Sequence, residues 1–299
     1  MELKALAKKS LPVSADDADA ETATPRALRI SKSNDLITAS YRLTLNEQRL
    51  ILAAISGLDP RRPMPKRVIV HATDYAEIYG VQLKHAYKQM RTAADELYER
   101  DIDFSDSKHR SRRRWVDAAV YTEGAVELSF TIHVIPYLTM LYNKVTTYDL
   151  RRVARVDSVS TLRLFEMLMQ FRKTGWLHID VDRLRSVLGL SDAYKRFNNL
   201  RQRVIDPAVE EMRQKCGLDV TYEQITKGRT VTAIKFSFAD LAQMALPLMP
   251  EPDDPRDTEL AEFDPKTFEA EWFSMEPIGD IEGESESLSA ERYLSGRES

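Results

Sequence analysis

The chain has 299 residues, of which 43% are hydrophobic, with a formal net charge of −4. This length predicts two compact domains rather than one, and no apolar run approaches the ~20 residues that a membrane-spanning helix needs. Cys216 is the single cysteine, which excludes an internal disulfide and cysteine-based metal sites, so we interpret it as a small buried thiol.

Residues 1–29 are expected to form a disordered N-terminal tail. The segment lacks the continuous apolar core of a signal peptide, and Asp16, Asp17 and Asp19 argue against an organelle transit peptide. These features predict a cytoplasmic protein.

A first series of elements is expected between residues 45 and 134. The pattern predicts a helix over 45–58, a strand over 67–71, a short helix capped by Thr73 or Asp74 and ended by Gly80, a helix over 85–100, and strands over 101–104, 114–121 and 125–134. A basic loop over 108–114 joins the first two of these last strands. Helices and strands of this kind predict an α+β domain.

A second series repeats this order. We expect a helix over 162–173 stopped by Gly175, a strand over 176–179, a short helix opened by Asp180 or Asp182 and ended by Gly189, a helix from Tyr194, and strands over 218–225 and 231–238. The two glycine turns match in spacing and hydrophobicity: Tyr75, Ile78, Tyr79, Gly80 and Val81 correspond to Leu184, Val187, Leu188, Gly189 and Leu190.

The repeat predicts an α+β fold with two tandem winged-helix domains, each a helix-turn-helix followed by a β-hairpin wing. The expected parts are a disordered tail over 1–29, a first winged-helix domain over 30–150, a second winged-helix domain over 151–242, and an acidic disordered tail over 243–299. Chance similarity of two αβ pieces is a weaker explanation, because every element recurs in order.

The helix after Gly189 has the pattern of a DNA-recognition helix. At 100° per residue, Phe197, Leu200, Val204 and Ala208 share a packed side. The predicted DNA-binding residues are Lys195, Arg196, Asn198, Asn199, Arg201, Gln202 and Arg203. Arginine suits guanine edges, asparagine and glutamine suit adenine, and lysine suits phosphate. Pro207 is expected to kink this helix or to restart it with Asp206 as the cap. The alternative is the solvated face of an ordinary helix.

Cationic groups are also predicted in the wing and in the first domain. Lys227 and Arg229 flank the tip of the second hairpin, which suits phosphate or a minor groove. The equivalent helix of the first domain begins with Lys84, His85, Lys88, Gln89 and Arg91, and Arg110, Arg112, Arg113 and Arg114 are expected in its wing. A flexible solvated loop explains the arginine run equally well.

Charge is distributed unevenly along the chain. Residues 241–299 carry 16 acidic and 4 basic residues, and residues 1–24 carry 5 acidic and 3 basic residues, so the remaining residues, 25–240, carry a net charge of +10. A basic body with an acidic tail is common in proteins that bind nucleic acid. The aromatic residues Phe263, Phe268, Trp272 and Phe273 lie among these acids, either as a short helix that docks on a partner or as incidental parts of a solubilising tail.

Sequence patterns for catalysis are missing. The five histidines include no pair two residues apart, as the metal site of a rolling-circle nicking enzyme requires, and no Gly-rich loop ends in Gly-Lys-Ser/Thr. The expectation is a protein with no catalytic residues, no metal and no cofactor.

The run NDLITASYRLTLNEQRLILAAIS, from Asn34 onward, resembles the opening of iteron-binding plasmid replication initiator proteins. Further similarity lies in TDYAEIYG, LRQRVIDPAVEEM, LDVTYEQITKGR and IKFSFADL, so that the resemblance covers roughly residues 30–242. By this resemblance, the principal recognition helix lies over 195–203, with Arg201 and Arg203 at paired arginine positions. Gln202 departs from the basic residue that relatives often have, and the acidic tail is not part of the shared pattern.

The resemblance implies a function. A monomer would bind direct repeats in double-stranded plasmid origin DNA, help to open the duplex, and recruit the host replication initiator and replicative helicase. A homodimer in equilibrium with it would repress the protein's own promoter. The alternative is a winged-helix transcriptional regulator without a role in replication.

Overall fold

The computed structural model describes residues 28–105, 110–141, 144–190 and 193–241. The tails expected over 1–29 and 243–299, including the aromatic residues among the C-terminal acids, lie almost wholly outside these ranges. So do Lys108 and His109 of the expected basic loop.

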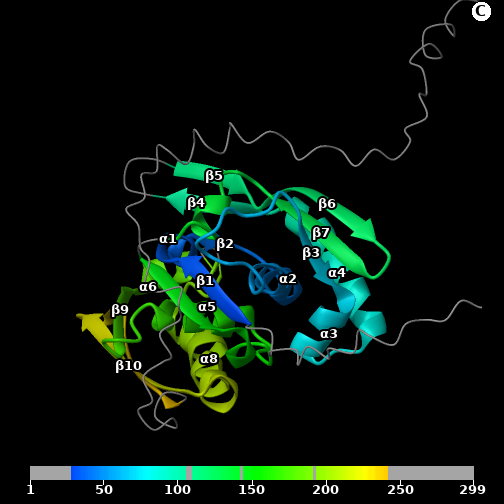
Figure 1. Ribbon diagram of the computed structural model, residues 1–299. Helices are drawn as coiled ribbons and strands as arrows, with labels where there is room; N and C mark the ends of the chain where they lie inside the picture. The colour runs from blue at the N-terminus through cyan, green and yellow to red at the C-terminus, as the bar shows by residue number, and fades with distance from the viewer. Residues whose placement is uncertain (1–27, 106–109, 142–143, 191–192, 242–299) are drawn as a thin grey trace, which may run out of the picture. The chain divides into compact units, whose positions relative to one another are not determined.

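The described chain begins with elements that the sequence patterns did not predict. β1 (Arg29–Ser33) pairs antiparallel with β8 (Val145–Asp149), and α1 (Asn34–Thr38) follows β1 directly. The Ser33 side chain accepts a hydrogen bond from the Asp35 backbone N–H and so caps α1. The pairing of β1 with β8 brings the beginning and the end of the first half of the chain side by side (Figure 1).

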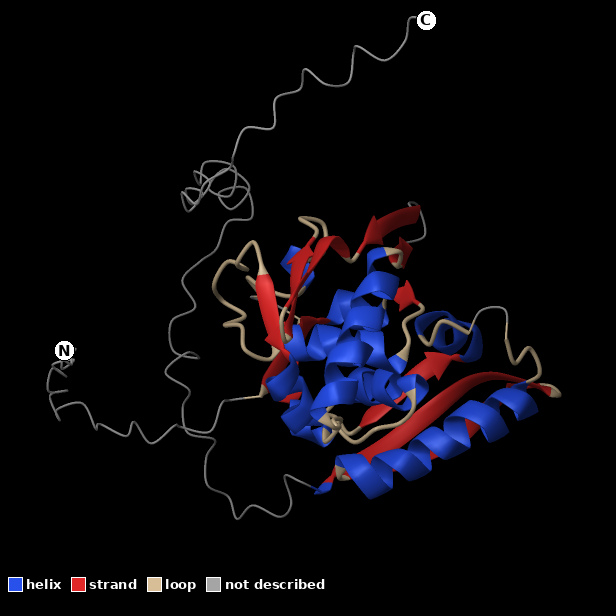
Figure 2. Ribbon diagram, turned by 90° about the vertical axis from the view of Figure 1, so that its right-hand side faces the viewer, coloured by secondary structure: helices blue, strands red, loops and turns tan. Residues whose placement is uncertain are grey.

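The first winged-helix domain contains the expected order of elements. It consists of α2 (Leu45–Ile55), β3 (Val68–His71), α3 (Ala72–Tyr79), α4 (Leu83–Tyr98), β6 (Val116–Thr122) and β7 (Ala125–Phe130). The sheet order is β3-β7-β6, and α4 packs against β6 and β7. The long helix that lies along two strands in Figure 2 is instead the one over residues 197–216, which belongs to the second domain. The expected cap at Thr73 or Asp74 is wrong, because α3 already begins at Ala72, after His71 as N-cap.

Two short strands and the arginine run form an additional sheet in this half. β2 (Ser40–Tyr41) pairs with β4 (Asp101–Ser105), which pairs with β5 (Arg110–Arg114). Short 3₁₀ helices, η1 (Ile135–Tyr137) and η2 (Leu150–Arg152), lie before and after β8. Trp115, between β5 and β6, is fully buried and packs edge-on against Tyr41 at 5.1 Å between ring centroids.

The second winged-helix domain repeats the topology of the first. It consists of α5 (Val159–Met169), β9 (Trp176–Asp180), α6 (Val181–Val187), α7 (Phe197–Leu200), η3 (Arg201–Ile205), α8 (Asp206–Glu211), η4 (Met212–Cys216), β10 (Leu218–Lys227) and β11 (Thr230–Asp240). The lone strand β9 pairs with the second hairpin strand β11, as β3 pairs with β7. The buried first helix of each copy, α2 or α5, supplies much of the core.

The two predicted glycine turns have the same geometry. Gly80 has φ of 63° and Gly189 has φ of 69°, a region that glycine enters without steric penalty. In each turn the next backbone N–H bonds a carbonyl five residues back: Val81 to Ala76 at 3.1 Å, and Leu190 to Arg185 at 2.8 Å. This bond is typical of the Schellman motif that ends a helix. The repeat seen in the sequence is therefore confirmed at its most specific point.

Candidate nucleic-acid interface

The polar side of α7 and η3 is exposed, as the periodicity predicts. Leu200 and Val204 are 0% and 6% exposed, and they pack this helical segment against the rest of the second domain. On the opposite side lie four exposed residues: Asn198, Asn199, Gln202 and Arg203. The segment formed by α7 and η3 therefore presents amide and guanidinium groups to solvent. Side chains of these types match the base edges in a major groove.

The helix begins three residues later than expected. Tyr194 has φ of 52°, and α7 starts at Phe197 with Arg196 as its N-cap, so Lys195 and Arg196 lie exposed in the preceding turn. The Arg185 guanidinium fixes this turn by donating to the carbonyls of Tyr194 at 3.1 Å and Lys195 at 2.7 Å. Sequence reasoning missed Arg185; a basic residue in the last turn of a helix is the signal that points to such a role.

The expected restart at Asp206 is also wrong. Ile205 and Asp206 have right-handed helical backbone angles, so α7, η3, α8 and η4 form one continuous rod as far as Gly217. η3 is a π-helical segment in which the Asp206 N–H bonds the Arg201 carbonyl, five residues back. Pro207 has no N–H and its ring would clash with the carbonyl four residues back; the wider π turn directly before it accommodates the ring without ending the helix.

Arg201 is oriented along its own helix rather than fully outward. Its Nε lies 3.8 Å from the Asp206 carboxylate, and its side chain is 35% exposed. The Tyr222 hydroxyl of β10 donates a hydrogen bond to the same carboxylate. Burial, and then this hydrogen bond to Asp206, raise the pKa of Tyr222 to about 12, so the tyrosine stays neutral. Asp206 therefore links the rod to the wing strand and partly neutralises Arg201.

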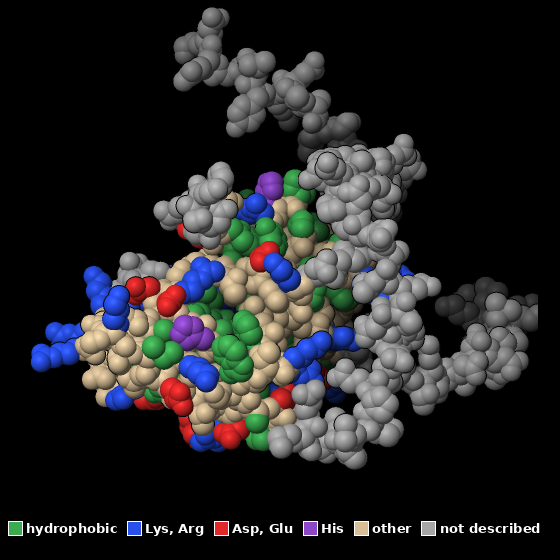
Figure 3. Space-filling model, turned by 90° about the vertical axis from the view of Figure 1, so that its left-hand side faces the viewer, with side chains coloured by type: hydrophobic (Ala, Val, Ile, Leu, Met, Phe, Trp, Pro, Cys, Tyr) green, Lys and Arg blue, Asp and Glu red, His purple; other side chains and the backbone are tan. Residues whose placement is uncertain are grey.

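The wing of the second domain has a cationic tip. Lys227 and Arg229 are exposed at either side of Gly228, whose φ is 65°. No ion pair to an acidic group within the described ranges involves Lys195, Lys227 or Arg229. Figure 3 views the side on which β9 and β10 lie in Figure 1 and shows Lys and Arg side chains projecting from the edge of that face.

The equivalent helix of the first domain, α4, is also exposed at its start. Lys84, His85, Lys88 and Arg91 are exposed, whereas Gln89 is half-buried. The Arg91 guanidinium lies over the ring of Tyr121 in β6, at 5.3 Å from the ring centroid. α4 therefore presents a second cationic helix start to solvent.

The arginine run does not lie in the first wing. By the sheet order, the hairpin equivalent to β10–β11 is β6–β7, and its tip is Glu123-Gly124, which carries an acid instead of a cation. Arg112, Arg113 and Arg114 belong to strand β5 of the separate sheet with β4, so both the wing and the flexible loop are wrong as descriptions of them. Arg113 stacks over Phe104 at 5.2 Å from the ring centroid. Side-chain stacking on the partner strand explains why a run of like charges forms a strand.

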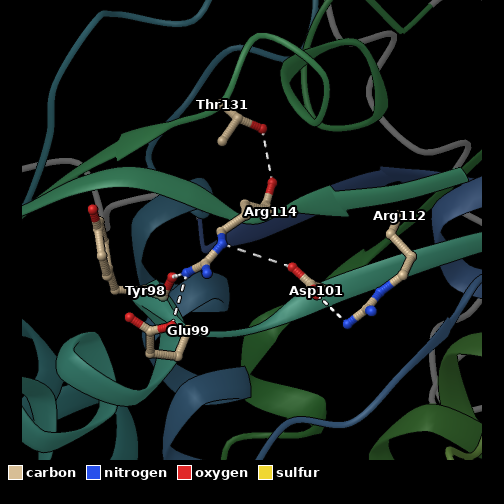
Figure 4. Close-up of polar contacts among 6 residues, drawn as sticks. All are labelled: Tyr98, Glu99, Asp101, Arg112, Arg114 and Thr131. Carbon is tan, nitrogen blue, oxygen red and sulfur yellow. Dashed lines mark hydrogen bonds and ion pairs between the residues drawn. The ribbon is translucent and has the colours of Figure 1, made fainter.

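Acidic groups pair with two of these arginines (Figure 4). Asp101 of β4 bonds the Arg112 guanidinium and lies 3.9 Å from Arg114 Nε. Arg114 also bonds Glu99 at 3.1 Å. The side chains of Arg112 and Arg114 remain 67% and 48% exposed, but their guanidinium groups are paired with acidic side chains of the protein. The cationic character of this strand is thus weaker than its sequence indicates.

Replacing Asp101 with asparagine is expected to strengthen binding to random duplex DNA. The amide has the same shape without the charge that holds Arg112 and Arg114, and the slope of log K against log salt should steepen by about 0.9 for each phosphate gained. Because exposed ion pairs contribute about 0–1 kcal/mol, the stability should change little. Asp117→Asn, an exposed acid on β6, removes the same charge away from these arginines and should leave the slope closer to wild type. Equal slopes in both variants would show that Asp101 does not restrain the arginines.

Sites for other chemistry are not evident in the described part of the chain. Among residues 28–105, 110–141, 144–190 and 193–241, no cluster of three His, Cys, Asp or Glu side chains could hold a metal ion. Across the same ranges, no helix has the length and apolarity to cross a membrane. Cys216 is buried, and burial raises the pKa of its thiol to about 12, which suits the structural role expected of it.

Comparisons with known proteins agree with this geometry. Residues 29–169 match the family model described as initiator replication protein, WH1, and residues 180–238 match that described as initiator Rep protein, WH2. A replication initiation protein from Escherichia coli is 25% identical over 230 residues, 73% of this chain and 72% of the relative. An uncharacterized 27.6 kDa protein from Escherichia coli is 25% identical over 226 residues, 70% of this chain and 95% of the relative.

A solved structure shows the same fold. The crystal structure of Pi initiator protein in complex with iteron DNA superposes with a TM-score of 0.62 at 20% identity, covering 72% of this chain and 98% of the other. The fold of two winged-helix domains is therefore confirmed. The domain boundary expected between residues 150 and 151 stays a prediction.

Proposed function

Because the chain belongs to the family of initiator replication proteins, we propose that it binds repeated sites in double-stranded plasmid origin DNA. The observation that carries the proposal is the exposed polar side of α7 and η3 beside the cationic tip of the wing. A similar protein, Pi initiator, has been crystallised with iteron DNA. We propose that binding energy rather than covalent catalysis drives the function, in the cytoplasm where plasmid DNA lies.

Both helix-turn-helix units take part in the proposed complex. The exposed starts of α4 and of α7 would enter successive major grooves, with half-site centres about 10 bp apart. Bending such a duplex costs several kcal/mol, which phosphate contacts by the wing and by both helix starts would offset.

The regulatory part of the proposal follows from family resemblance. A monomer would bind the origin, promote its opening and recruit the host replication initiator and replicative helicase, whereas a homodimer would repress the protein's own promoter. The first winged-helix domain would supply most of the dimer contact.

Footprinting of the purified chain on DNA that flanks its own gene tests the proposal. Protection of tandem direct repeats of about 20 bp, together with loss of plasmid maintenance on gene deletion, would support it. A single inverted repeat with no effect on maintenance would instead indicate a transcriptional regulator. A salt titration on the same DNA counts phosphate contacts, at a slope of about −0.9 per contact.

Arg203→Ala is expected to weaken binding to the protected repeat by about 1–3 kcal/mol, because an exposed arginine on the recognition face can form two hydrogen bonds with a guanine. Competition binding on the repeat, on its single-base variants and on random duplex measures this loss. In this variant, the preference for one base over the others should weaken at a single base pair of the repeat. Arg213→Ala, at the far end of the same rod where Arg213 bonds Asp219 at 2.9 Å, is the matched control. Equal loss on the repeat and on random DNA would assign Arg203 to the phosphate backbone.

A further inference from the structure

Side chains from the first half of the chain hold the turn that precedes α7. The Arg42 Nε donates to the Gly189 carbonyl at 2.7 Å, and the Ser40 hydroxyl donates to the Ser186 carbonyl at 2.8 Å. A Cβ added to Gly189 would lie 2.7 Å from the Tyr41 carbonyl oxygen. The backbone before α2 therefore lies directly against the second helix-turn-helix unit.

The turn that precedes α4 is held in the same way by the second half of the chain. An Arg155 Nη donates to the Tyr79 carbonyl at the end of α3. A Cβ on Gly80 would overlap this nitrogen, so the guanidinium covers the glycine. Carbonyls at the end of a helix carry partial negative charge, which favours a cation at both positions.

The contacts are reciprocal. Arg42 precedes the Thr44 N-cap of α2 and reaches into the second domain, whereas Arg155 precedes the Ser158 N-cap of α5 and reaches into the first. Each turn is followed by the helix whose start is exposed for DNA. Arginines from opposite halves thus attach to the two turns that position α4 and α7.

A second pair of arginines, of which Arg163 is buried and Arg49 half-buried, repeats the exchange. Arg49 and Arg163 are each the fifth residue of their helices, α2 and α5. Arg49 donates to the Val156 carbonyl at 3.0 Å, and Arg163 donates to the Ala39 carbonyl at 2.8 Å. Arg163 is 1% exposed and also donates to the carbonyl of Val187 in α6, at 2.9 Å. Directional bonds of this kind resist both sliding and rotation between the halves.

We propose that Arg42 and Arg155 are positioning residues that fix α4 relative to α7 and thereby set the spacing at which the chain accepts two DNA half-sites. The inference rests on the proposed function and adds to it a source of specificity that does not touch DNA. One extra base pair between half-sites shifts them by about 3.4 Å and rotates them by about 35°. A rigid pair of helices cannot follow that change, whereas a loosened pair can.

The test uses the full chain and the duplex that it protects, with the natural spacing or with one base pair inserted between the half-sites. For wild type, the insertion should lower affinity on the order of 10- to 100-fold, because simultaneous engagement is lost. For Arg42→Gln combined with Arg155→Gln, it should lower affinity no more than about 5-fold, while affinity for the natural site falls. Arg151→Gln, in the same segment, removes an arginine that bonds Asp149 in its own turn and should keep the wild-type penalty.

Binding to an isolated half-site duplex shows whether each recognition helix is intact in the variants. Arg42→Lys and Arg155→Lys keep a cation at each helix end and should give intermediate spacing penalties. An unchanged penalty in every variant that binds a half-site would overturn the proposal. Loss of half-site binding in all of them, lysine variants included, would also overturn it, since the arginines would then be needed for folding. A wild-type chain that binds the repeat and a scrambled duplex equally would contradict the proposed function itself, and with it this inference.

Discussion

Replacing Lys32 with methionine is expected to lower the free energy of unfolding by about 3–5 kcal/mol. Lys32 Nζ lies 2.7 Å from Glu166 Oε1, and the two side chains are 1% and 0% exposed. The Tyr148 hydroxyl donates to the same carboxylate oxygen at 2.6 Å. Without the lysine, the Glu166 carboxyl group is left buried without this cationic partner, and it keeps its hydrogen bond from Tyr148. Chemical denaturation measures the loss.

A second substitution separates the buried charge from simple loss of packing. In Lys32→Met combined with Glu166→Gln, no charge is buried and the amide oxygen still accepts from Tyr148, so most of the stability should return. Lys84→Met changes an exposed lysine on α4 and should stay within about 0.5 kcal/mol of wild type. If the double variant were as unstable as Lys32→Met, the ion pair would not be the cause.

This ion pair marks the part of the fold that the sequence could not predict. β1 is the short segment Arg29–Ser33, in which serine and lysine accompany a single isoleucine, and an isolated segment of this kind has no strand pattern. Its burial depends on β8, more than a hundred residues later, and on Glu166 of α5. Only the tertiary contacts make this polar segment a buried strand.

The glycine turns and the recognition face, in contrast, were predictable because local geometry determines them. A left-handed residue after an apolar helix favours glycine, and helical spacing alone places Asn198 and Gln202 opposite Leu200 and Val204. The start of α7 was placed too early because Arg185, from another element, fixes Tyr194 in the turn.

The position of the first wing could not be predicted from the sequence, because it depends on which strands pair. Sequence alone assigned the arginine run to a loop or wing, since like charges repel and favour neither strand nor helix. The structure pairs β5 with β4, where Asp101 offsets Arg112 and the Phe104 ring supports Arg113. The basic run and the first wing thus belong to different sheets. Of the two wing tips, both within the described residues, that of the second domain carries cationic side chains and that of the first does not.

Gly189→Ala is expected to destabilise the protein by about 3 kcal/mol or more and to weaken DNA binding beyond that loss. A left-handed backbone costs an alanine about 1–2 kcal/mol. The added Cβ would also lie 2.7 Å from the Tyr41 carbonyl oxygen, a backbone atom that cannot move without shifting the first domain against the second. The rod formed by α7, η3, α8 and η4, called the recognition rod below, follows this turn, so a shift of the turn also moves α7. Denaturation and binding to the protected repeat are measured together.

Gly228→Ala supplies the matched control, because Gly228 has φ of 65° but a Cβ added to it would meet no atom within 4 Å. It should cost only the backbone strain of about 1–2 kcal/mol. The difference between the two variants then isolates the close approach of the two domains at Gly189. Equal losses would mean that strain alone determines the effect and that the first domain does not support the turn. A larger loss at Gly189, accompanied by weaker binding at fully folded conditions, would identify the contact between Tyr41 and Gly189 as part of what positions the recognition rod.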